Sequence, residues 1–374
     1  MAPTVIDIRS AEDLRDVVHL AVQALAEGKV VAFPTETVYA VAASALDPIA
    51  TARLLTAKRR KSGQPPLTLA VKSADDALDY VPRMSRLAQR IARRCWPGPI
   101  TLVCHDDHPE SVLTQLPQPV REAVVPSGTI GLRVPGHPVF LDVMRMLAGP
   151  IVVSSANRSG QPDSQTAADV VRALGDDVQL VLDDGQSRFG VPSTVVKVNE
   201  KSFELLRVGV VSEQTLRRLA SLVILFVCTG NTCRSPMAET IARKLIADRI
   251  GCRIDQLEDR GVIVQSAGLS AMSGGGAAAE AIDVLAAIGL DLGPHESQPL
   301  TGQMVRYADM IFPMTRSHRQ AILSQWPEAA SRTELLAVDQ SDIADPIGGP
   351  PEVYRRCAEQ LQAELNARVA KLEI

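Results

Sequence analysis

The sequence predicts two α/β domains joined in one chain of 374 residues. The length exceeds that of a typical single domain. Apolar β-branched runs alternate with amphipathic stretches along the whole chain, which is the pattern of β–α units. A helical pattern at 211–221 is followed at once by an apolar run at 222–227. We therefore place the domains at residues 1–220 and 221–374.

In the first domain, short apolar runs predict buried strands and amphipathic segments between them predict helices. The domain is expected to form a twisted α/β sheet, closed by a last helix with Ser212 as its N-cap. The expected strands lie at 29–35, 100–104, 150–155 and 193–198, and the expected helices at 11–27, 47–58, 85–94, 137–148, 165–175 and 211–221.

The second domain is expected to be a small doubly wound parallel α/β sheet. Such sheets bind ligands at the carboxyl ends of their strands, and Cys228 stands at the end of the first strand. The expected strands lie near 222–227, 262–266, 308–313 and 333–336, and the expected helices near 236–249, 277–288, 316–326 and 351–371.

The composition is that of a globular protein, with 46% hydrophobic and 22% charged residues and a net charge of -4. Bulk charge therefore gives no reason to expect a nucleic-acid partner. Residues 1–220 carry 25 Lys+Arg against 24 Asp+Glu, and residues 221–374 carry 14 against 19. The first domain is thus the better candidate for anionic ligands.

No apolar run reaches the ~18 residues of a membrane span, and we expect no membrane segment and no signal peptide. The six cysteines are scattered and show neither a disulfide framework nor a zinc-binding pair. A reducing cytoplasm is the expected location. His105 and His108 are interpreted as part of a polar loop, so no metal site is expected.

The segment "VCTGNTCRSPMAE" places a cysteine at the end of a strand, before a curled loop. Gly230 and Asn231 tolerate positive φ, so the loop is expected to turn its N–H groups inward. Ser235 and Pro236 suit the N-cap and first position of a helix whose positive end would favour a thiolate at Cys228. Ser235 is placed to donate a hydrogen bond to that thiolate.

The planar guanidinium of Arg234 suits two oxygens of a phosphate. With Cys228, it predicts a nucleophile at the base of an anion cradle. The loop between them supplies the expected phosphate-loop and specificity residues Thr229, Gly230, Asn231, Thr232 and Cys233.

Residues 221–374 resemble the low-molecular-weight protein tyrosine phosphatase family, through this segment together with "SAG" (266–268) and "ADMIFPMT" (308–315). The resemblance implies that Cys228 attacks phosphorus and becomes a phosphocysteine. It also implies a general acid in an Asp-Pro loop, which "DIADPIGG" supplies as Asp345, with Asp342 as the nearby competitor. No cofactor is implied for this reaction.

Two positions bear on the substrate. Thr232 occupies a site where tyrosine-specific members carry a bulky aliphatic residue, and the protein arginine phosphatase branch resembles this chain in carrying threonine. Ile347 follows Asp-Pro where an aromatic residue is usual. Phosphoarginine in a protein is the preferred substrate, with phosphotyrosine and arsenate reduction as alternatives. Cys233 is either a reversible disulfide partner of Cys228 or a packed small residue.

Several motifs of the first domain place cations, hydroxyls or amides at strand ends, which suits a nucleotide cleft. Each motif alone is weak, because a basic run is usually a solvated face and a Ser-Asn pair is often a turn. They are "AFPTETVYA" (32–40), "KRRKSGQPPLTLAV" (58–71), "GLRVPGHP" (131–138), "VVSSANRSG" (152–160), "GVPSTVV" (190–196) and "LLRVGV" (205–210).

In this order the motifs resemble the threonylcarbamoyl-adenylate synthases, over about residues 12–212. The resemblance implies a sheet with a concave basic cleft. It also implies synthesis of an adenylate from L-threonine, bicarbonate and ATP with Mg²⁺, for N6-threonylcarbamoyl modification of tRNA adenosine by partner proteins. The implied ATP- and threonine-binding residues are Thr35, Lys58, Arg60, Arg133, Ser155, Asn157, Ser193 and Arg207.

One departure from the family's motif bears on two hypotheses for the function of the first domain. The family usually has Tyr-Gly-Leu-Gly where this chain has Tyr39-Ala40-Val41-Ala42, and alanine would obstruct a site that needs positive φ or a close backbone approach. The leading hypothesis is a bifunctional synthase and phosphatase. The alternative is a phosphotyrosine phosphatase whose first domain only binds nucleotide or RNA.

Overall fold

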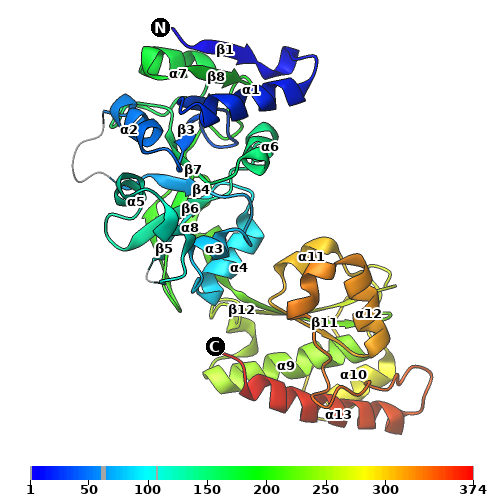
Figure 1. Cartoon of the computed structure of the whole chain (residues 1–374). Coiled ribbons are helices and arrows are strands. Elements are labelled where there is room, and N and C mark those ends of the chain that lie inside the picture. Colours follow the sequence, from blue (N-terminus) through cyan, green and yellow to red (C-terminus); the bar gives the residue numbers. More distant parts are fainter. Residues whose placement is uncertain (1, 60–64, 107, 374) are drawn as a thin grey trace. The chain divides into compact units, whose positions relative to one another are not determined.

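The structure is a computed structural model that describes residues 2–59, 65–106 and 108–373. The chain divides into two compact units, unit 1 (Met1–Leu219) and unit 2 (Ala220–Ile374). Figure 1 shows both units and labels most of their helices and strands.

In the described part of unit 1, ten strands form one mixed sheet in the order β1-β8-β2-β3-β7-β4-β6-β5-β9-β10. The central strands β3 and β7 pair antiparallel, whereas β4 and β6 pair parallel. The strands are β1 (Thr4–Asp7), β2 (Val31–Phe33), β3 (Ala40–Ser44), β4 (Thr68–Ala70), β5 (Ile100–His105), β6 (Thr129–Arg133), β7 (Ile151–Ser155), β8 (Leu180–Asp183), β9 (Thr194–Val198) and β10 (Phe203–Arg207).

Helices surround this sheet, and most start where a polar side chain caps the first turn. Thr166 and Asp169 form a capping box at α7, and Ser212 accepts from the Thr215 N–H just before α8. The helices are α1 (Leu14–Ala26), α2 (Pro48–Ala57), α3 (Ala77–Tyr80), α4 (Arg86–Cys95), α5 (Gln118–Val124), α6 (Pro138–Met146), α7 (Ala167–Leu174) and α8 (Glu213–Ala220), with short 3-10 turns η1 (Ile8–Ser10), η2 (Val112–Gln115) and η3 (Gly175–Asp177).

The core of unit 1 is aliphatic with a small aromatic centre. Phe33 on β2 stacks on Phe140 of α6 with ring centroids 4.4 Å apart. Leu25 on α1 belongs to the same buried cluster. Helices α1 and α6 therefore cover this region of the sheet.

The two alanines that replace the family's glycines lie in the regular strand β3. Ala40 pairs with Ser155 and Ala42 with Val153 of β7, and neither alanine is among the residues with positive φ. Ala42 is fully buried in the core cluster. The backbone here is thus extended, and alanine enters it without conformational strain.

Unit 2 contains the parallel three-stranded sheet β12-β11-β13, formed by β11 (Leu222–Cys228), β12 (Val262–Gly268) and β13 (Met310–Pro313). The strand expected at 333–336 is not formed. Thr333 makes only an isolated bridge to Ile311, and Leu336 N–H donates to the Pro313 carbonyl. The segment follows β13, but too few of its residues pair for a strand.

Alternate residues of β11 enter two cores, which makes unit 2 doubly wound (Figure 1). Ile224, Phe226 and Cys228 pack with α9, α10 and α13, whereas Val223, Leu225 and Val227 pack with α11 and α12. The helices are α9 (Arg234–Ile250), α10 (Ala279–Ala286), α11 (Gly302–Tyr307), α12 (Arg316–Gln325) and α13 (Pro351–Ala370), with η4 (Ile254–Gln256) and η5 (Pro327–Arg332).

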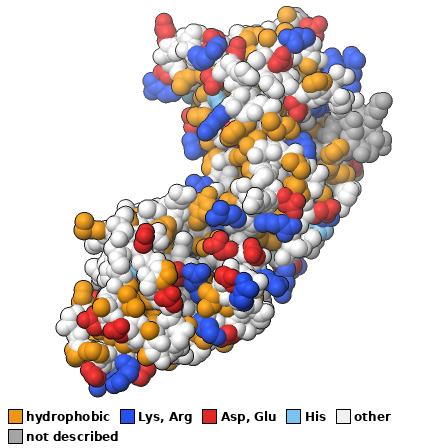
Figure 2. Space-filling model, turned by 180° about the vertical axis from the view of Figure 1, so that it is seen from behind, with side chains coloured by type: hydrophobic (Ala, Val, Ile, Leu, Met, Phe, Trp, Pro, Cys, Tyr) orange, Lys and Arg blue, Asp and Glu red, His pale blue; other side chains and the backbone are white. Residues whose placement is uncertain are grey.

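On the face drawn in Figure 2, Lys/Arg and Asp/Glu side chains are interspersed. This mixture agrees with the small net charge of -4. Among the described residues, no helix combines the length and apolar character needed to cross a membrane.

Candidate active sites

The first candidate site lies where β11 ends and α9 begins. Cys228 is the last residue of β11 and is 3% exposed. The loop that follows turns at Asn231, which has φ of +54°. Gly230, expected to share this conformation, is not among the glycines with positive φ. One left-handed residue is enough to curl the loop around the sulfur.

Two polar groups lie within hydrogen-bonding distance of the Cys228 sulfur. The Ser235 Oγ lies 3.0 Å from Cys228 Sγ, and the Asn231 N–H donates to the sulfur at 3.3 Å. The expectation that Ser235 is an N-cap is wrong, because α9 already begins at Arg234 with Cys233 as its N-cap. Ser235 lies in the first helical turn, where its hydroxyl faces the sulfur instead of the helix backbone.

A second layer of hydrogen bonds holds Asn231 in its left-handed conformation. Its Nδ2 donates to Ser235 Oγ at 2.9 Å and to Ser266 Oγ at 2.8 Å. Its Oδ1 accepts from the Gln298 N–H at 2.9 Å, and its carbonyl oxygen lies 2.8 Å from His295 Nε2. The sequence reasoning named "SAG" at 266–268 but no role for Ser266, and it missed Gln298 and His295.

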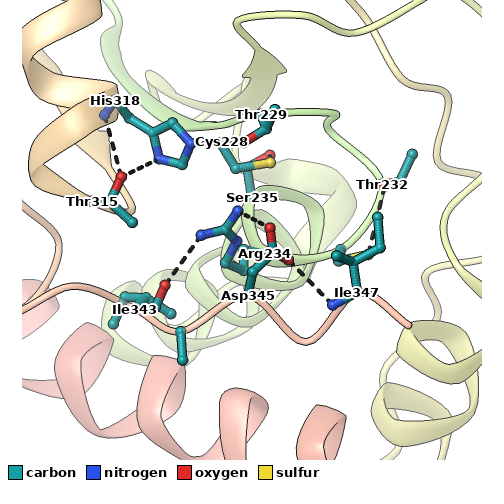
Figure 3. A network of polar contacts seen from close by, with 12 residues as sticks. Cys228, Thr229, Thr232, Arg234, Ser235, Thr315, His318, Ile343, Asp345 and Ile347 are labelled. Atoms are coloured by element: carbon teal, nitrogen blue, oxygen red, sulfur yellow. Dashed lines mark hydrogen bonds and ion pairs between the residues drawn. The ribbon is translucent and has the colours of Figure 1, made fainter. Parts of the chain in front are cut away.

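Arg234 and Asp345 form an ion pair beside the sulfur (Figure 3). The Arg234 side chain is 5% exposed, whereas that of Asp345 is 41% exposed. Arg234 also donates to the Ile343 carbonyl at 3.2 Å. Asp342 makes a different contact, accepting from the Arg316 N–H at 2.8 Å. Of the two aspartates, Asp345 is therefore the one in contact with the phosphate-loop arginine.

Thr232 and Ile347 place a hydroxyl and an aliphatic side chain at one edge of the loop. Thr232 and Ile347 lie on the same side of Cys228 in Figure 3, and Ile347 is 69% exposed. Cys233 is buried, with its sulfur 3.6 Å from both Thr232 Oγ1 and the Tyr354 hydroxyl. The surroundings of Cys233 are those of a packed residue in this state.

A histidine that the sequence reasoning missed lies on the other side of Cys228. His318 Nε2 is 2.9 Å from Thr229 Oγ1, and His318 Nδ1 is 2.9 Å from Thr315 Oγ1. Burial, followed by the positive charge of Arg234, lowers the pKa of His318 to about 4. The imidazole is consequently neutral near pH 7. Thr315-x-x-His318 at a helix start was the available signal.

The second candidate site is in unit 1 and is assembled from separate strand and helix ends. Lys58, the C-cap of α2, is 4% exposed, and its Nζ donates to the Ser155 carbonyl at 2.6 Å and to Asn157 Oδ1 at 2.9 Å. Ser155 is the last residue of β7. The structure thus brings together three of the four residues of the Lys-x-Arg and Ser-x-Asn signatures. The fourth, Arg60, lies outside the described residues.

A buried ion pair stands at the end of β6. Arg133 NH2 donates to Glu36 Oε1 at 2.7 Å and to Thr37 Oγ1 at 2.9 Å. The Thr37 hydroxyl lies 2.8 Å from that of Thr35. Arg133 and Thr35 therefore belong to one network, with Glu36 and Thr37 as members that the sequence reasoning did not name.

The remaining two predicted residues contact one another. Arg207 donates to the Ser193 carbonyl at 2.9 Å and to Ser193 Oγ at 3.1 Å. Burial, and to a smaller extent the positive charge of Arg133, lower the pKa of Arg207, while Asp163 opposes this shift. The guanidinium groups of Arg207 and Arg133 thus repel one another, and an anion bound near both would reduce this repulsion.

Within the residues that the structure describes, no group of three or more His, Cys, Asp or Glu side chains is arranged to hold a metal ion. The donors of the unit 1 site are a lysine, arginines, hydroxyls and an amide. Such a set suits an anion or a nucleotide better than a bare cation.

Two family profiles match the chain. The Sua5/YciO/YrdC profile, described as "Telomere recombination", matches residues 23–209, half of the chain. The profile of the low molecular weight phosphotyrosine protein phosphatases matches residues 223–373. Each match lies wholly within one of the two units.

Relatives in other organisms divide in the same way. The chain is 35% identical over 194 residues to a threonylcarbamoyl-AMP synthase of Pyrococcus abyssi, covering 51% of this chain but only 54% of that relative. It is 36% identical over 196 residues to a putative threonylcarbamoyl-AMP synthase of Mycobacterium tuberculosis, covering 52% of this chain and 85% of the relative. A protein-arginine-phosphatase of Geobacillus stearothermophilus is 36% identical over 154 residues, covering 40% of this chain and 95% of the relative.

A solved structure of Pyrococcus abyssi Sua5 complexed with L-threonine is also similar. Its TM-score is 0.52 at 24% identity, with 71% of this chain and 92% of that chain covered. At this identity the likeness shows the fold alone.

Proposed function

Because the chain belongs to the Sua5/YciO/YrdC family through residues 23–209 and to the low-molecular-weight phosphotyrosine protein phosphatase family through residues 223–373, we propose that it is a bifunctional enzyme. Unit 1 would synthesise L-threonylcarbamoyladenylate from L-threonine, bicarbonate and ATP, for tRNA modification with partner proteins. Unit 2 would dephosphorylate proteins through a phosphocysteine intermediate.

The observation that carries the phosphatase proposal is the grouping of Cys228, Ser235, Arg234 and Asp345 around one loop. The Cys228 thiolate attacks phosphorus while Arg234 holds two phosphoryl oxygens. The phosphate replaces Asp345 as the partner of Arg234. Asp345 then protonates the leaving group, and afterwards takes a proton from the water that hydrolyses the phosphocysteine.

Phosphoarginine is the substrate that suits the rim best. Thr232 offers a hydroxyl that can accept a hydrogen bond from a guanidinium. Ile347, at 69% exposure, offers no ring on which a phenol could stack. A relative that is covered over 95% of its length is a protein-arginine-phosphatase. Phosphotyrosine is the alternative substrate.

For the synthase, we assign anion binding to Arg207 and to the buried Lys58, and orientation of threonine and nucleotide to Ser155 and Asn157. Thr35, Ser193 and Arg60 would complete the site. Arg133 would contribute to it through its ion pair with Glu36. Mg²⁺ would arrive with the triphosphate of ATP and neutralise its charge there. A threonine complex is known for the Sua5 relative of matching fold.

The same proposal places the chain in a reducing cytoplasm, because Cys228 acts only while its sulfur is reduced. The alternative, a phosphatase with a binding-only unit 1, was motivated by Ala40 and Ala42. Both lie in an unstrained, paired strand. Neither alanine therefore strains the backbone, which favours the bifunctional enzyme over the alternative.

Two assays on the purified chain test the proposal. The first compares kcat/KM for phosphate release from phosphoarginine and phosphotyrosine peptides. We expect phosphoarginine to be preferred and Thr232→Ile to shift the ratio about 10-fold toward phosphotyrosine, with Thr232→Ser as the control. The second measures ATP consumption that requires both threonine and bicarbonate. Absence of that requirement would support the binding-only alternative.

A further inference from the structure

His318 connects the start of α12 to the residue that follows the nucleophile. Its side chain is buried, at 6% exposure for the residue, and both ring nitrogens have partners: Thr229 Oγ1 and Thr315 Oγ1, each at 2.9 Å. Thr315 also caps α12 by accepting from the His318 N–H at 3.2 Å. The helix therefore fixes the ring, and the ring fixes the hydroxyl of Thr229.

The phosphocysteine steps require nothing of this histidine. The charged groups that act on it are Arg234 from α9 and Asp345 and Asp342 from the loop before α13. Neighbouring Arg234 and burial keep the ring neutral. A neutral ring also places no second positive charge beside a cationic leaving group.

The Thr229 oxygen keeps a free acceptor whichever ring nitrogen carries the proton. If Nε2 is protonated, Thr229 Oγ1 accepts from it with one lone pair and retains the other. If Nδ1 is protonated, the Thr229 hydroxyl donates to Nε2 and both lone pairs remain. Thr229 thus offers an acceptor in either tautomer of His318.

The position of Thr229 makes this acceptor available to a substrate. Thr229 is exposed. In Figure 3 Thr229 lies next to the Cys228 sulfur, with His318 on one side and Thr232 and Ile347 on the other. A guanidinium carries N–H donors along two edges, whereas a phenolic oxygen that leaves from tyrosine carries none.

We propose that His318 is a positioning residue which holds the Thr229 hydroxyl as a second acceptor for the guanidinium of phosphoarginine, in addition to that of Thr232. This inference rests on the proposed phosphatase function and deepens it. Recognition then comes from two hydroxyls, of which that of Thr229 is held in place by His318 and Thr315.

The test compares kcat/KM for a phosphoarginine peptide and for a simple aryl phosphate in four variants of the full chain. We expect His318→Leu and Thr229→Val each to lower the phosphoarginine value about 5- to 10-fold, the effect of one lost hydrogen bond. The aryl phosphate value should fall less than the phosphoarginine value, so that the ratio of the two values decreases. Thr229→Ser and His318→Gln, which retain a hydroxyl and an amide donor, should restore most of the loss.

The double variant Thr229→Val with His318→Leu should lose no more than either single variant, because both remove the same contact. A matched pair controls for helix stability. Thr315→Val and Thr301→Val each remove the N-cap of a helix, at α12 and α11. Only Thr315→Val should reduce the phosphoarginine ratio.

The outcomes separate the two ideas. If the wild-type chain does not hydrolyse phosphoarginine, the proposed substrate is wrong and this inference falls with it. If the wild type does so but Thr229→Val leaves the ratio of the two substrates unchanged, only the inference is overturned. Equal losses on both substrates in His318→Leu and Thr229→Val would likewise reduce His318 to a structural residue.

Discussion

Each unit contains a buried arginine paired with a carboxylate. The two pairs differ in the exposure of the carboxylate and in the hydrogen bonds that hold it. In unit 1, Arg133 pairs with Glu36, whose side chain is 12% exposed. The second oxygen of Glu36 accepts from the Gly136 N–H at 2.8 Å. A Cβ on Gly136 would lie only 3.2 Å from the Glu36 carboxyl carbon. Glu36 is thus enclosed, with both of its carboxylate oxygens held by hydrogen bonds.

In unit 2, Arg234 pairs with Asp345, whose side chain is 41% exposed. The second oxygen of Asp345 accepts a hydrogen bond from the Ile347 N–H in its own loop, at 3.3 Å. This loop also contains Gly348 with φ of +72°. An arginine–carboxylate pair is therefore buried at both partners in one unit, whereas in the other unit its carboxylate is partly exposed and can exchange for a bound anion. The burial of the carboxylate and its hydrogen bonds decide which kind of pair forms.

The largest expected effect separates the two units. Cys228→Ser should lower phosphatase turnover by at least about 10⁴-fold, because it removes the nucleophile. Threonine-dependent ATP consumption should remain unchanged in the same preparation. Cys252→Ser is the control, because this cysteine lies beyond the far end of α9. Loss of both activities in Cys228→Ser would contradict two independent sites.

Removal of the exchangeable acid should reduce catalysis without unfolding the protein. Asp345→Asn should lower kcat about 10²- to 10³-fold, as expected for a lost general acid, with little change in the urea midpoint. Asp342→Asn is its matched neighbour and should retain most of the activity. Equal losses in the two variants would remove the basis for choosing Asp345.

Removal of the enclosed Glu36 carboxylate should reduce the stability of unit 1 without reducing phosphatase activity. Glu36→Gln leaves the Arg133 charge buried without its counterion, so unit 1 should lose about 3 kcal/mol of unfolding free energy. Phosphatase activity at 25 °C should be unaffected. Urea unfolding followed by circular dichroism measures the change, and an unaltered midpoint would mean that the Arg133–Glu36 pair is not structural.

His318 predicts how the stability of unit 2 depends on pH. Its pKa is about 4 in the folded protein against an ordinary value of 6.5, so the unfolded chain takes up the proton first as pH falls. This contribution is complete above pH 6.5 and is lost progressively down to pH 4. The drop in urea midpoint between pH 7 and pH 5 should therefore be smaller in His318→Gln than in wild type. Equal drops would argue against the buried neutral ring.

The smallest effect concerns the alanines of β3. Ala42→Gly should destabilise unit 1 by about 0.5–1 kcal/mol, because glycine loses more backbone entropy on folding and leaves a small void in the core. Threonine-dependent ATP consumption should not increase. A clear increase would mean that alanine does obstruct the site, and would favour the binding-only alternative for unit 1.

Features set by adjacent residues were predicted from the sequence. The order strand, cysteine, loop, arginine and helix at 222–250 appears in the structure as β11 and α9, because apolar runs and local dihedral preferences act over a few residues. The doubly wound sheet of unit 2 follows from the same patterns. The sheet of unit 1 was predicted only in part: the expected strand at 29–35 contains β2, whereas the three residues of β4 are too few to give a reliable pattern of their own.

The tertiary structure alone decided which distant residues meet. Asp345 lies 111 positions from Arg234, and His318 lies 89 positions from Thr229. No local preference encodes such contacts. Packing of α12 and α13 against the sheet selects Asp345 over Asp342 and places His318 beside the nucleophile. The sequence by itself determined the strand that ends in Cys228, the loop after it and the helix that follows. The acid, the neutral histidine and the enclosed Arg133–Glu36 pair depend on long-range packing, in which burial and neighbouring charge assign the role of each side chain.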